Sequence, residues 1–327
     1  MGGIRSAAAC AAAAVILACS GNARPPAQSP RYPHAGDYKQ ELAVGPDTRS
    51  YVLHLPPDYA KHVPLPVVVA LHGGGGNAAM FEGVAGLNGP ADERGFAVVY
   101  PDGSGNLDPR LLTWNAGLCC GYARKLAIDD VGFVWALLAE LARDLDLDRT
   151  RVYAVGHSNG GMMAYRLAAQ SPGRIAAIVS VAGPDMTEST GSGPPVPVLH
   201  IHSLDDPRAI YAGGVPTLMG LSEPVTFRSV DETLGRWRER DGCSGDGRLV
   251  DERKLESHRA ELVDYGPCAG GSTVMLWRLH GPGHGWPGGT SILPVSLVGE
   301  RTRVILAADE TFRFLPRFSR PDAPPLR

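Results

Sequence analysis

The sequence carries little net charge, and this limits its partners. Its 31 lysines and arginines against 34 aspartates and glutamates leave a formal charge of −3 at pH 7. Binding to nucleic acid, or to a lipid surface by charge alone, requires a strongly basic face. We therefore expect neither partner. The 327 residues also show no internal repeat and no heptad run, which excludes solenoid and coiled-coil architectures.

Signatures of bound metals and nucleotides are missing as well. The sequence has no CxxC pair with partner histidines, so the cysteines do not predict a metal site. The glycine-rich run at 72–77 is not followed by Gly-Lys-Ser/Thr and lacks the setting of a dinucleotide-binding turn. We expect neither a metal nor a cofactor.

No apolar run is long enough to cross a bilayer comfortably, but the N-terminus carries an export pattern. Arg5 is the only early charge, and an Ala-rich apolar run follows at 7–18. This pattern is typical of a secretory signal, which we place at residues 1–19. Residues 16–20 resemble a bacterial lipobox, in which Cys19 becomes the lipidated first residue and anchors the protein to the membrane. Ordinary cleavage nearby, with release from the cell, is the alternative.

The rest of the chain predicts one domain at 41–316, between a Pro-rich linker at 20–40 and a flexible tail at 317–327. Apolar, β-branched runs of strand length occur at Ser50–Leu55, Pro66–Leu71, Phe96–Tyr100, Val152–Val155, Ala176–Val181, Val196–Ile201 and Thr273–Leu279. Helical patterns alternate with them at Asp129–Leu145, Asn159–Gln170, 229–240 and 300–315. Because several strands are apolar on nearly every residue, helices are expected on both faces of a mostly parallel, doubly wound α/β sheet.

One segment breaks this alternation. Residues 207–272 are far longer than a plain crossover needs, so we expect a subdomain or a flap there. An exported chain favours disulfides, and Cys243 and Cys268 within this segment are the favoured pair. Cys119 and Cys120 would then form a strained vicinal bond or stay free.

The strongest chemical signal is Gly156–Gly160, with the sequence Gly-His-Ser-Asn-Gly. It follows the strand at 151–155 and precedes the helix at 159–170. This strand, turn and helix setting is that of the nucleophile elbow in α/β-hydrolases, which makes Ser158 the candidate nucleophile. An ordinary serine in a glycine-rich turn is the alternative.

A serine nucleophile needs a base and an acid, which follow it in the chain in this fold. His284 lies in a glycine-rich loop just after the strand ending at Leu279, where its imidazole can reach the sheet edge. The acid should follow the strand ending at Ile201, and Asp205 and Asp206 are both candidates. We prefer Asp206 because the proline after it fixes the turn.

An oxyanion hole requires two backbone N–H groups aimed at the developing negative charge. One should come from Asn159, the residue after the nucleophile. The other should come from the loop after an early strand, where Gly73 or Gly74 is the candidate donor. Further along, Asp129 and Asp130 precede a helix and are expected to cap its N-terminus.

Several short motifs together characterise one group of proteins. They are His72-Gly73, Trp114-Asn115-Ala116-Gly117 with Cys119-Cys120, Asp129–Phe133, Arg151–Tyr153, Gly156–Met163 and Gly283–Gly289. With them, the chain resembles the polyhydroxybutyrate depolymerase-type esterases, which are close to feruloyl and acetylxylan esterases and include lipoproteins.

The resemblance implies an α/β-hydrolase fold and a Ser–Asp–His triad that matches Ser158 and His284. The acid motif of the family reads His-Gly-Thr-x-Asp-Pro and appears here at 202–207, which supports Asp206. This chain departs from the family by carrying Ser203-Leu204 in that motif, and Gly285 where a threonine is common.

The implied activity is hydrolysis of hydroxyalkanoate oligomers or related esters through an acyl-enzyme. Feruloyl or acetylxylan esters of plant polysaccharide are the first alternative. A peptidase of the same fold and a non-catalytic binding protein on the same scaffold are two more. Trp114 and Trp286 lie in loops of the pattern, where they either form an apolar wall for the substrate or pack in the core.

Overall fold

The computed structural model describes residues 1–2, 31–107, 109–215, 225–290 and 294–326. The predicted signal segment, with Cys19, lies outside the described residues apart from its first two positions. Among the helices that the structure describes, none combines the length and apolar character needed to cross a membrane.

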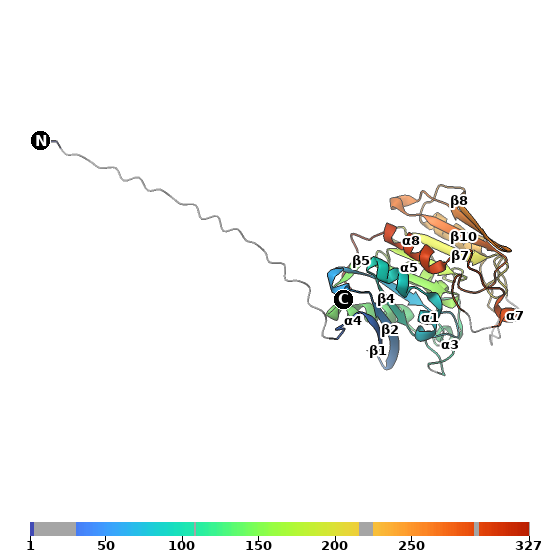
Figure 1. Cartoon of the computed structure of the whole chain (residues 1–327), viewed down its shortest axis with the longest axis horizontal. Coiled ribbons are helices and arrows are strands. Elements are labelled where there is room, and N and C mark those ends of the chain that lie inside the picture. Colours follow the sequence, from blue (N-terminus) through green and yellow to red (C-terminus); the bar gives the residue numbers. More distant parts are fainter. Residues whose placement is uncertain (3–30, 108, 216–224, 291–293, 327) are drawn as a thin grey trace.

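The described residues contain one ten-stranded sheet with the strand order β1-β2-β4-β3-β5-β6-β7-β10-β9-β8 (Figure 1). The strands are β1 Gly36–Val44, β2 Asp47–Leu55, β3 Leu65–Leu71, β4 Ala97–Pro101, β5 Leu147–His157, β6 Ala177–Val181, β7 Val198–Ser203, β8 Arg248–Leu255, β9 His258–Asp264 and β10 Val274–His280. Neighbouring strands are parallel from β4 to β10, and antiparallel pairs complete both edges.

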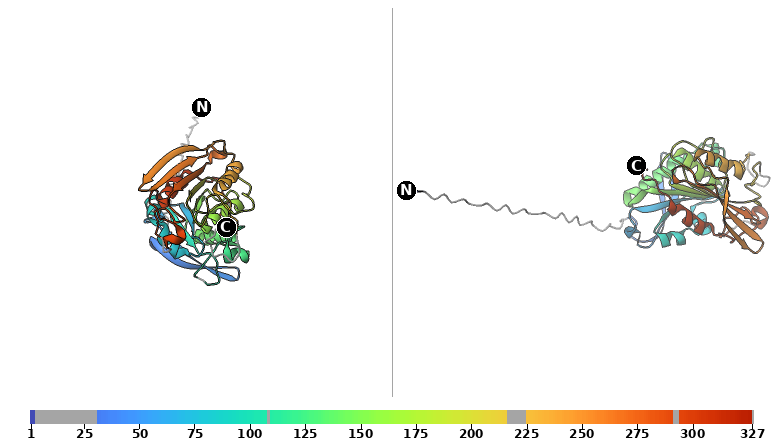
Figure 2. Two further views of the ribbon diagram at one scale, coloured as in Figure 1. Left: turned by 90° about the vertical axis from the view of Figure 1, so that its right-hand side faces the viewer. Right: turned by 90° about the horizontal axis from the view of Figure 1, so that it is seen from above.

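Helices cover both faces of this sheet. They are α1 Ala78–Ala85, α2 Asn88–Arg94, α3 Gly121–Lys125, α4 Asp130–Asp144, α5 Asn159–Gln170, α6 Val230–Arg240, α7 Val295–Val298 and α8 Ala307–Phe314, with short 3₁₀ turns at Tyr59–Lys61, Ala269–Gly271 and Leu315–Arg317. Side chains of α4, α5 and α6 join one buried cluster, and those of α1, α2 and α8 join the other (Figure 2). The fold is therefore the expected doubly wound α/β-hydrolase arrangement.

The central strands are buried on both faces, as their continuous apolar sequences predict. Every residue of β3, β4, β6 and β7 is buried. All seven predicted strands are present, and the helices predicted at Asp129–Leu145, Asn159–Gln170 and 229–240 correspond to α4, α5 and α6. The helical pattern at 300–315 is shorter than expected, because only Ala307–Phe314 is α-helical there.

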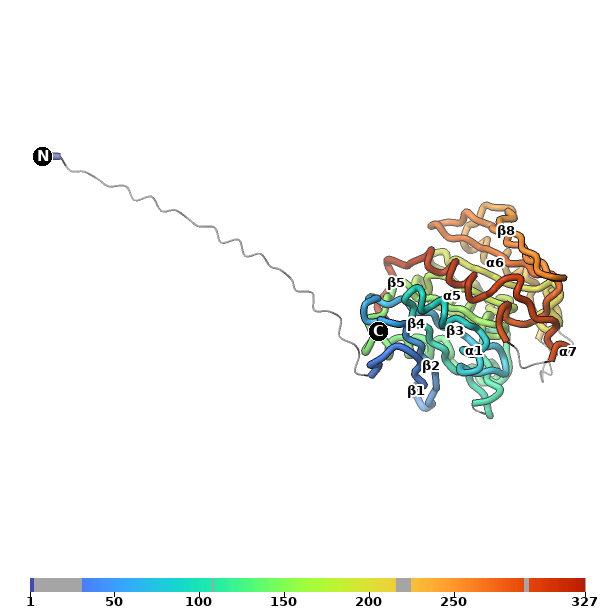
Figure 3. Tube along the Cα trace, viewed as in Figure 1, coloured from blue at the N-terminus to red at the C-terminus, as the bar shows by residue number. Residues whose placement is uncertain are grey.

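We expected a subdomain or a flap in the insertion at 207–272, of which the structure describes 207–215 and 225–272. Its described parts supply α6 and the β8–β9 hairpin, and β9 pairs with β10. Figure 3 follows the chain from blue β1 at one edge of the sheet to orange β8 at the other. The described part of the insertion thus widens the existing sheet. Cys243 and Cys268 are joined by the predicted disulfide, and Cys119 and Cys120 by a vicinal one.

The predicted linker and tail also need correction. Tyr32 is fully buried and β1 begins at Gly36, so the folded domain starts inside the 20–40 segment. The described part of the tail, 317–326, packs on the domain, since Arg320 N donates to Thr150 O at 2.7 Å and Arg320 Nε donates to Ile175 O at 3.0 Å. The prolines in these two terminal segments disfavour helices, but they do not prevent the segments from packing against the rest of the domain.

Candidate active site

Ser158 lies at the sharp turn between β5 and α5. Its backbone has φ 54° and ψ −121°, a conformation that a non-glycine residue adopts only where the surroundings enforce it. Close packing provides that constraint. A Cβ on Gly156 would lie 2.2 Å from the carbonyl carbon of Gly160, and one on Gly160 would lie 2.1 Å from Leu71 O. Glycine is therefore required on both sides of the turn.

The other two residues of the predicted triad meet Ser158 from neighbouring loops. His284 Nε2 lies 2.9 Å from Ser158 Oγ, and His284 Nδ1 lies 2.7 Å from Asp206 Oδ2. The loop after β7 carries Asp206 and the loop after β10 carries His284. Because β7 and β10 are parallel neighbours, both loops leave the same edge of the sheet.

The acid side chain is buried and fully hydrogen-bonded. Asp206 Oδ1 accepts from the backbone N–H groups of Arg208 and Ala209, each at 2.8 Å. Burial opposes its ionisation, but the charge of His284 and its hydrogen bond outweigh burial and lower the pKa of Asp206 to about 2. The carboxylate is therefore ionised at neutral pH, as an acid that orients an imidazole must be.

Asp205, the alternative acid, has another partner. Its Oδ2 accepts from Gly281 N at 2.7 Å, at the start of the loop that carries His284. The two neighbouring carboxylates thus support the same loop at different points.

The glycine loop expected to form part of the oxyanion hole packs directly against the turn. A Cβ on Gly73 would lie 3.4 Å from Ser158 Cβ and 3.1 Å from His157 Nδ1. His72 supports this loop, because its Nε2 accepts from Gly103 N at 2.9 Å and its Nδ1 therefore donates to Gly73 O at 2.8 Å. Burial lowers the pKa of His72 to about 4, so the ring is neutral.

The two tryptophans lie in the core rather than on a substrate-facing wall. Trp114 is completely buried and packs beside His72, with ring centroids 5.0 Å apart and ring planes tilted by 39°. Trp286 is 4% exposed and packs edge-on against Phe81 and His157. The packing alternative fits both side chains better.

Asp129 and Asp130 divide their roles. Asp129 caps α4 by accepting from Gly132 N at 2.8 Å, as predicted. Asp130 is fully buried, and its Oδ1 accepts from Arg49 at 2.9 Å while its Oδ2 accepts from Asn115 N at 2.8 Å. Sequence reasoning missed this ion pair, because the two residues are 81 positions apart and no local pattern connects them.

A chain of buried polar side chains behind the acid was also missed. Tyr165 OH lies 2.9 Å from His200 Nδ1, and His200 Nε2 lies 2.9 Å from His202 Nδ1. His202 Nε2 donates to Ala209 O at 2.6 Å and lies 3.5 Å from Asp206 Oδ2. The carbonyl can only accept, so each hydroxyl or N–H donates to the next group. Burial lowers the pKa of both histidines, which keeps this chain neutral.

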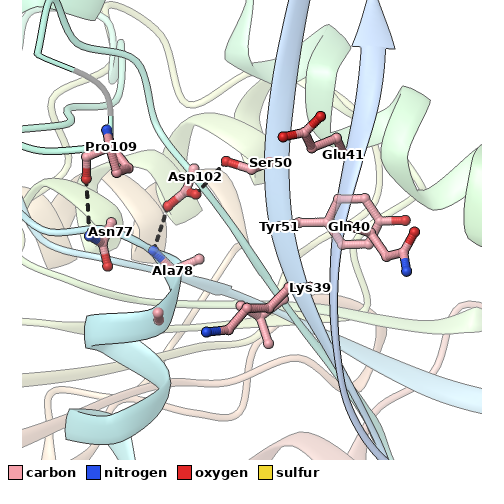
Figure 4. A pocket seen from close by; sticks show the side chains of 11 residues that line it. Lys39, Gln40, Glu41, Ser50, Tyr51, Asn77, Ala78, Asp102 and Pro109 are labelled. Carbon is pink, nitrogen blue, oxygen red and sulfur yellow. Dashed lines mark hydrogen bonds between the residues drawn. The ribbon is translucent and has the colours of Figure 1, made fainter.

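A cavity of about 560 Å³ lies between β1, β2 and the start of α1. In Figure 4, Lys39, Ser50, Asn77 and Asp102 surround it. Asp102 accepts from Ser50 Oγ and from Ala78 N, both at 2.6 Å, so its carboxylate holds the wall together. The triad residues are not part of its lining.

Comparison with known proteins agrees with this geometry. The family model for esterase PHB depolymerases matches residues 49–224. The chain belongs to this esterase family. NocK of Nocardia uniformis subsp. tsuyamanensis, which carries the name of an esterase, is 34% identical over 84% of this chain and 81% of its own length.

More distant relatives have named activities. Feruloyl esterase B of Piromyces equi is 27% identical over 72% of this esterase, and the bifunctional acetylxylan esterase/xylanase XynS20E of Neocallimastix patriciarum is 26% identical over 76%. The chain spans only 42% and 32% of these two proteins. Among solved structures, the dienelactone hydrolase-like promiscuous phosphotriesterase P91 from metagenomic libraries superposes with a TM-score of 0.51 at 16% identity, covering 88% of this chain and 99% of its own. This last similarity concerns the fold alone.

Proposed function

We propose that this esterase cleaves carboxylic esters by a serine mechanism in which Ser158 is the nucleophile, His284 the general base and Asp206 the acid. The observation that carries the proposal is the unbroken hydrogen-bond series of 2.9 Å and 2.7 Å that joins the three side chains. Such a series lets the imidazole take the serine proton while the buried carboxylate stabilises the imidazolium that forms.

Catalysis then proceeds through two acyl transfers. Ser158 Oγ attacks the ester carbonyl as His284 takes its proton, and the tetrahedral intermediate collapses when the imidazolium protonates the departing alcohol. Water next attacks the acyl-enzyme and gives a proton to His284. That proton returns to Ser158 Oγ as the carboxylic acid leaves, so the enzyme is restored without a cofactor.

The negative oxygen of each intermediate is stabilised by backbone N–H groups. We assign these to Asn159 at the start of α5 and to Gly73, with Gly74 as the neighbouring alternative. Gly73 is favoured because a Cβ on it would meet Ser158 itself at 3.4 Å, whereas a Cβ on Gly74 would meet Asn159 at 3.6 Å. The positive end of the α5 dipole points to the same place.

The proposed substrates are esters of feruloyl or acetyl groups with carbohydrate, which the named relatives support. Short hydroxyalkanoate oligomers are the second candidate class, supported by the description of the matching family. The peptidase and the non-catalytic binder expected as alternatives gain no such support.

We also propose that the protein is exported, with residues 1–19 as the signal and Cys19 as a lipid anchor. The support is the sequence pattern together with two disulfides, because structural disulfides persist in oxidising compartments. Metabolic labelling with a radiolabelled fatty acid tests the anchor. The wild-type chain should incorporate the label, and the Cys19→Ala variant should not. A wild-type chain without label would contradict the lipid anchor and favour secretion after ordinary signal cleavage.

The function is tested by assaying p-nitrophenyl acetate, methyl ferulate, acetylated xylo-oligosaccharides and hydroxybutyrate oligomers with wild type and Ser158→Ala. We expect hydrolysis by wild type only. A fluorophosphonate probe should form one adduct, which peptide mass spectrometry places on Ser158. Folded wild type that neither hydrolyses these esters nor takes up the probe would contradict the proposal.

A further inference from the structure

Trp114 was expected to contact substrate, but its hydrogen bonds point to another role. Its side chain is completely buried, so it cannot form the wall of an open site. Its indole Nε1 donates to His72 O at 2.9 Å. Its backbone N donates to Asn159 Oδ1 at 2.6 Å, and its backbone O accepts from Asn159 Nδ2 at 3.0 Å. One residue thus holds both segments assigned to the oxyanion hole.

The bond to His72 O determines where the Gly73 N–H points. These two groups belong to the same peptide unit, and that unit is not among the cis peptides of the described chain. In a trans peptide the C=O and the N–H point in opposite directions. When the indole fixes His72 O on one side, Gly73 N–H is directed to the other. Glycine backbone is otherwise easily rotated, so an external restraint on this peptide is needed.

The bonds to Asn159 fix the second donor in the same way. Asn159 is 3% exposed. Its side-chain amide makes one hydrogen bond to the N–H and one to the C=O of Trp114, as the backbone of a neighbouring strand does in a sheet. A side chain held at both polar atoms restrains its own backbone N–H at the start of α5. The loop that carries Trp114 is restrained in turn, because the next residue, Asn115, donates its N–H to buried Asp130.

We propose that Trp114 is the positioning residue of the oxyanion hole, aligning the Gly73 N–H through its indole and the Asn159 N–H through its backbone. This inference rests on the proposed serine mechanism and adds to it. A preorganised hole stabilises the charged intermediate without affecting the neutral ester to the same degree. Loss of alignment must therefore lower kcat more than it raises KM.

The test is Trp114→Phe, which keeps an aromatic ring in the core and removes the indole N–H. Trp237→Phe is the matched control, because Trp237 is also completely buried and donates its indole N–H, to Asp185 Oδ2 at 3.2 Å on the α6 side. Removing a whole oxyanion donor costs 10²–10³ in rate, so displacing one should lower kcat by roughly tenfold. KM should stay within about twofold of wild type.

A second readout isolates the oxyanion. An aryl trifluoromethyl ketone adds Ser158 Oγ to its carbonyl, and the hemiketal oxygen occupies the oxyanion hole. Its inhibition constant should rise with Trp114→Phe by about the factor that kcat falls, and stay unchanged with Trp237→Phe. Should Trp114→Phe fail to fold, 3-benzothienylalanine at position 114 keeps the ring shape and replaces N–H by sulfur, and the same losses are expected.

Three different outcomes would contradict either the role of Trp114 or the serine mechanism, and the measurements distinguish them. Folded Trp114 variants with kcat and ketone inhibition equal to wild type would overturn the role of Trp114 while leaving the serine mechanism intact. Equal losses in Trp237→Phe would assign the effect to core packing and overturn it too. Wild type that neither hydrolyses esters nor binds the ketone would overturn the proposed function itself.

Discussion

Asp205 and Asp206 are adjacent in sequence, yet their carboxylates contact two different residues of one loop, Gly281 and His284. Asp206 Oδ2 lies 2.7 Å from the imidazole of His284, and Asp205 Oδ2 accepts from Gly281 N at the same distance. Successive side chains at such a turn point in different directions, so only one can face the imidazole. The pair therefore offers two nearly identical substitutions with different expected effects.

Asp206→Asn should lower kcat by about 10³–10⁴-fold, since an amide does not stabilise the imidazolium and favours the wrong tautomer. Asp205→Asn keeps an oxygen that accepts from Gly281 N, so kcat should stay within about threefold of wild type. Steady-state kinetics on one p-nitrophenyl ester compares them. Equal losses in both variants would refute the assignment of the acid.

Gly160→Ala and Gly235→Ala test the packing at the nucleophile turn. The added methyl at Gly160 would lie 2.1 Å from Leu71 O, whereas the same methyl at Gly235, in α6, meets nothing within 4 Å. Gly160→Ala should lower the free energy of unfolding by about 2 kcal/mol or more. Gly235→Ala should raise it by about 0.5–1 kcal/mol, because alanine favours the helix. Urea denaturation measures both, and a tolerated alanine at 160 would show that the turn can relax.

Acid should destabilise the fold as pH falls below about 6.5, because the fold keeps four histidines neutral. Burial lowers the pKa of His72 and His157 to about 4 and also lowers those of His200 and His202. These folded-state values lie below the unfolded value of about 6.5, so the neutral rings stabilise the fold fully above pH 6.5 and progressively less toward pH 4. The free energy of unfolding should fall by up to about 1.4 kcal/mol per pH unit for each histidine.

Asp206 adds a second, lower window. Its folded pKa of about 2 lies below the ordinary aspartate pKa of 3.8, so its contribution to stability is present above pH 3.8 and is lost as pH falls toward 2. Denaturation curves between pH 7 and pH 2 should therefore show two successive losses. A free energy of unfolding that stays constant between pH 6.5 and pH 4 would contradict the lowered pKa values of these histidines in the folded protein.

Removing the Cys243–Cys268 disulfide should weaken the fold and spare the chemistry. The bond closes a segment of 25 residues, and the loss of that closure costs about 3 kcal/mol in the chain-entropy account. The double substitution to serine should lower stability by this amount, with kcat within about twofold of wild type because the triad lies outside the closed segment. A large fall in kcat at full folding would connect the insertion to the active site.

Local patterns predicted the parts of the fold that are locally determined. The central strands are continuous apolar runs, and the glycines around Ser158 belong to a five-residue pattern that the sequence shows directly. The edge strands were not predicted, because β1 and β8 carry exposed polar residues at many positions. Such strands are stabilised by hydrogen bonds to a neighbour, which no single segment reveals.

The candidate site shows the same division. Ser158 and His284 occupy recognisable turns, whereas the bonds of Trp114 join segments 42 and 45 residues away. The sequence alone does not distinguish a buried tryptophan from one that faces the substrate. The two cases are distinguished by the residues that contact the indole, which only the structure shows.

The β8–β9 hairpin has a practical consequence for engineering. Asp206 and His284 are 78 residues apart in sequence but are brought together by the direct pairing of β7 with β10. The hairpin lies beyond that pairing, at the far edge of the sheet. Glu256, in the turn of this hairpin, is exposed and has a φ of 55°. The turn is thus a suitable site for inserting a reporter peptide or for new chain termini. The catalytic loops would keep their shared strand pair, and so their alignment, on either side of the graft.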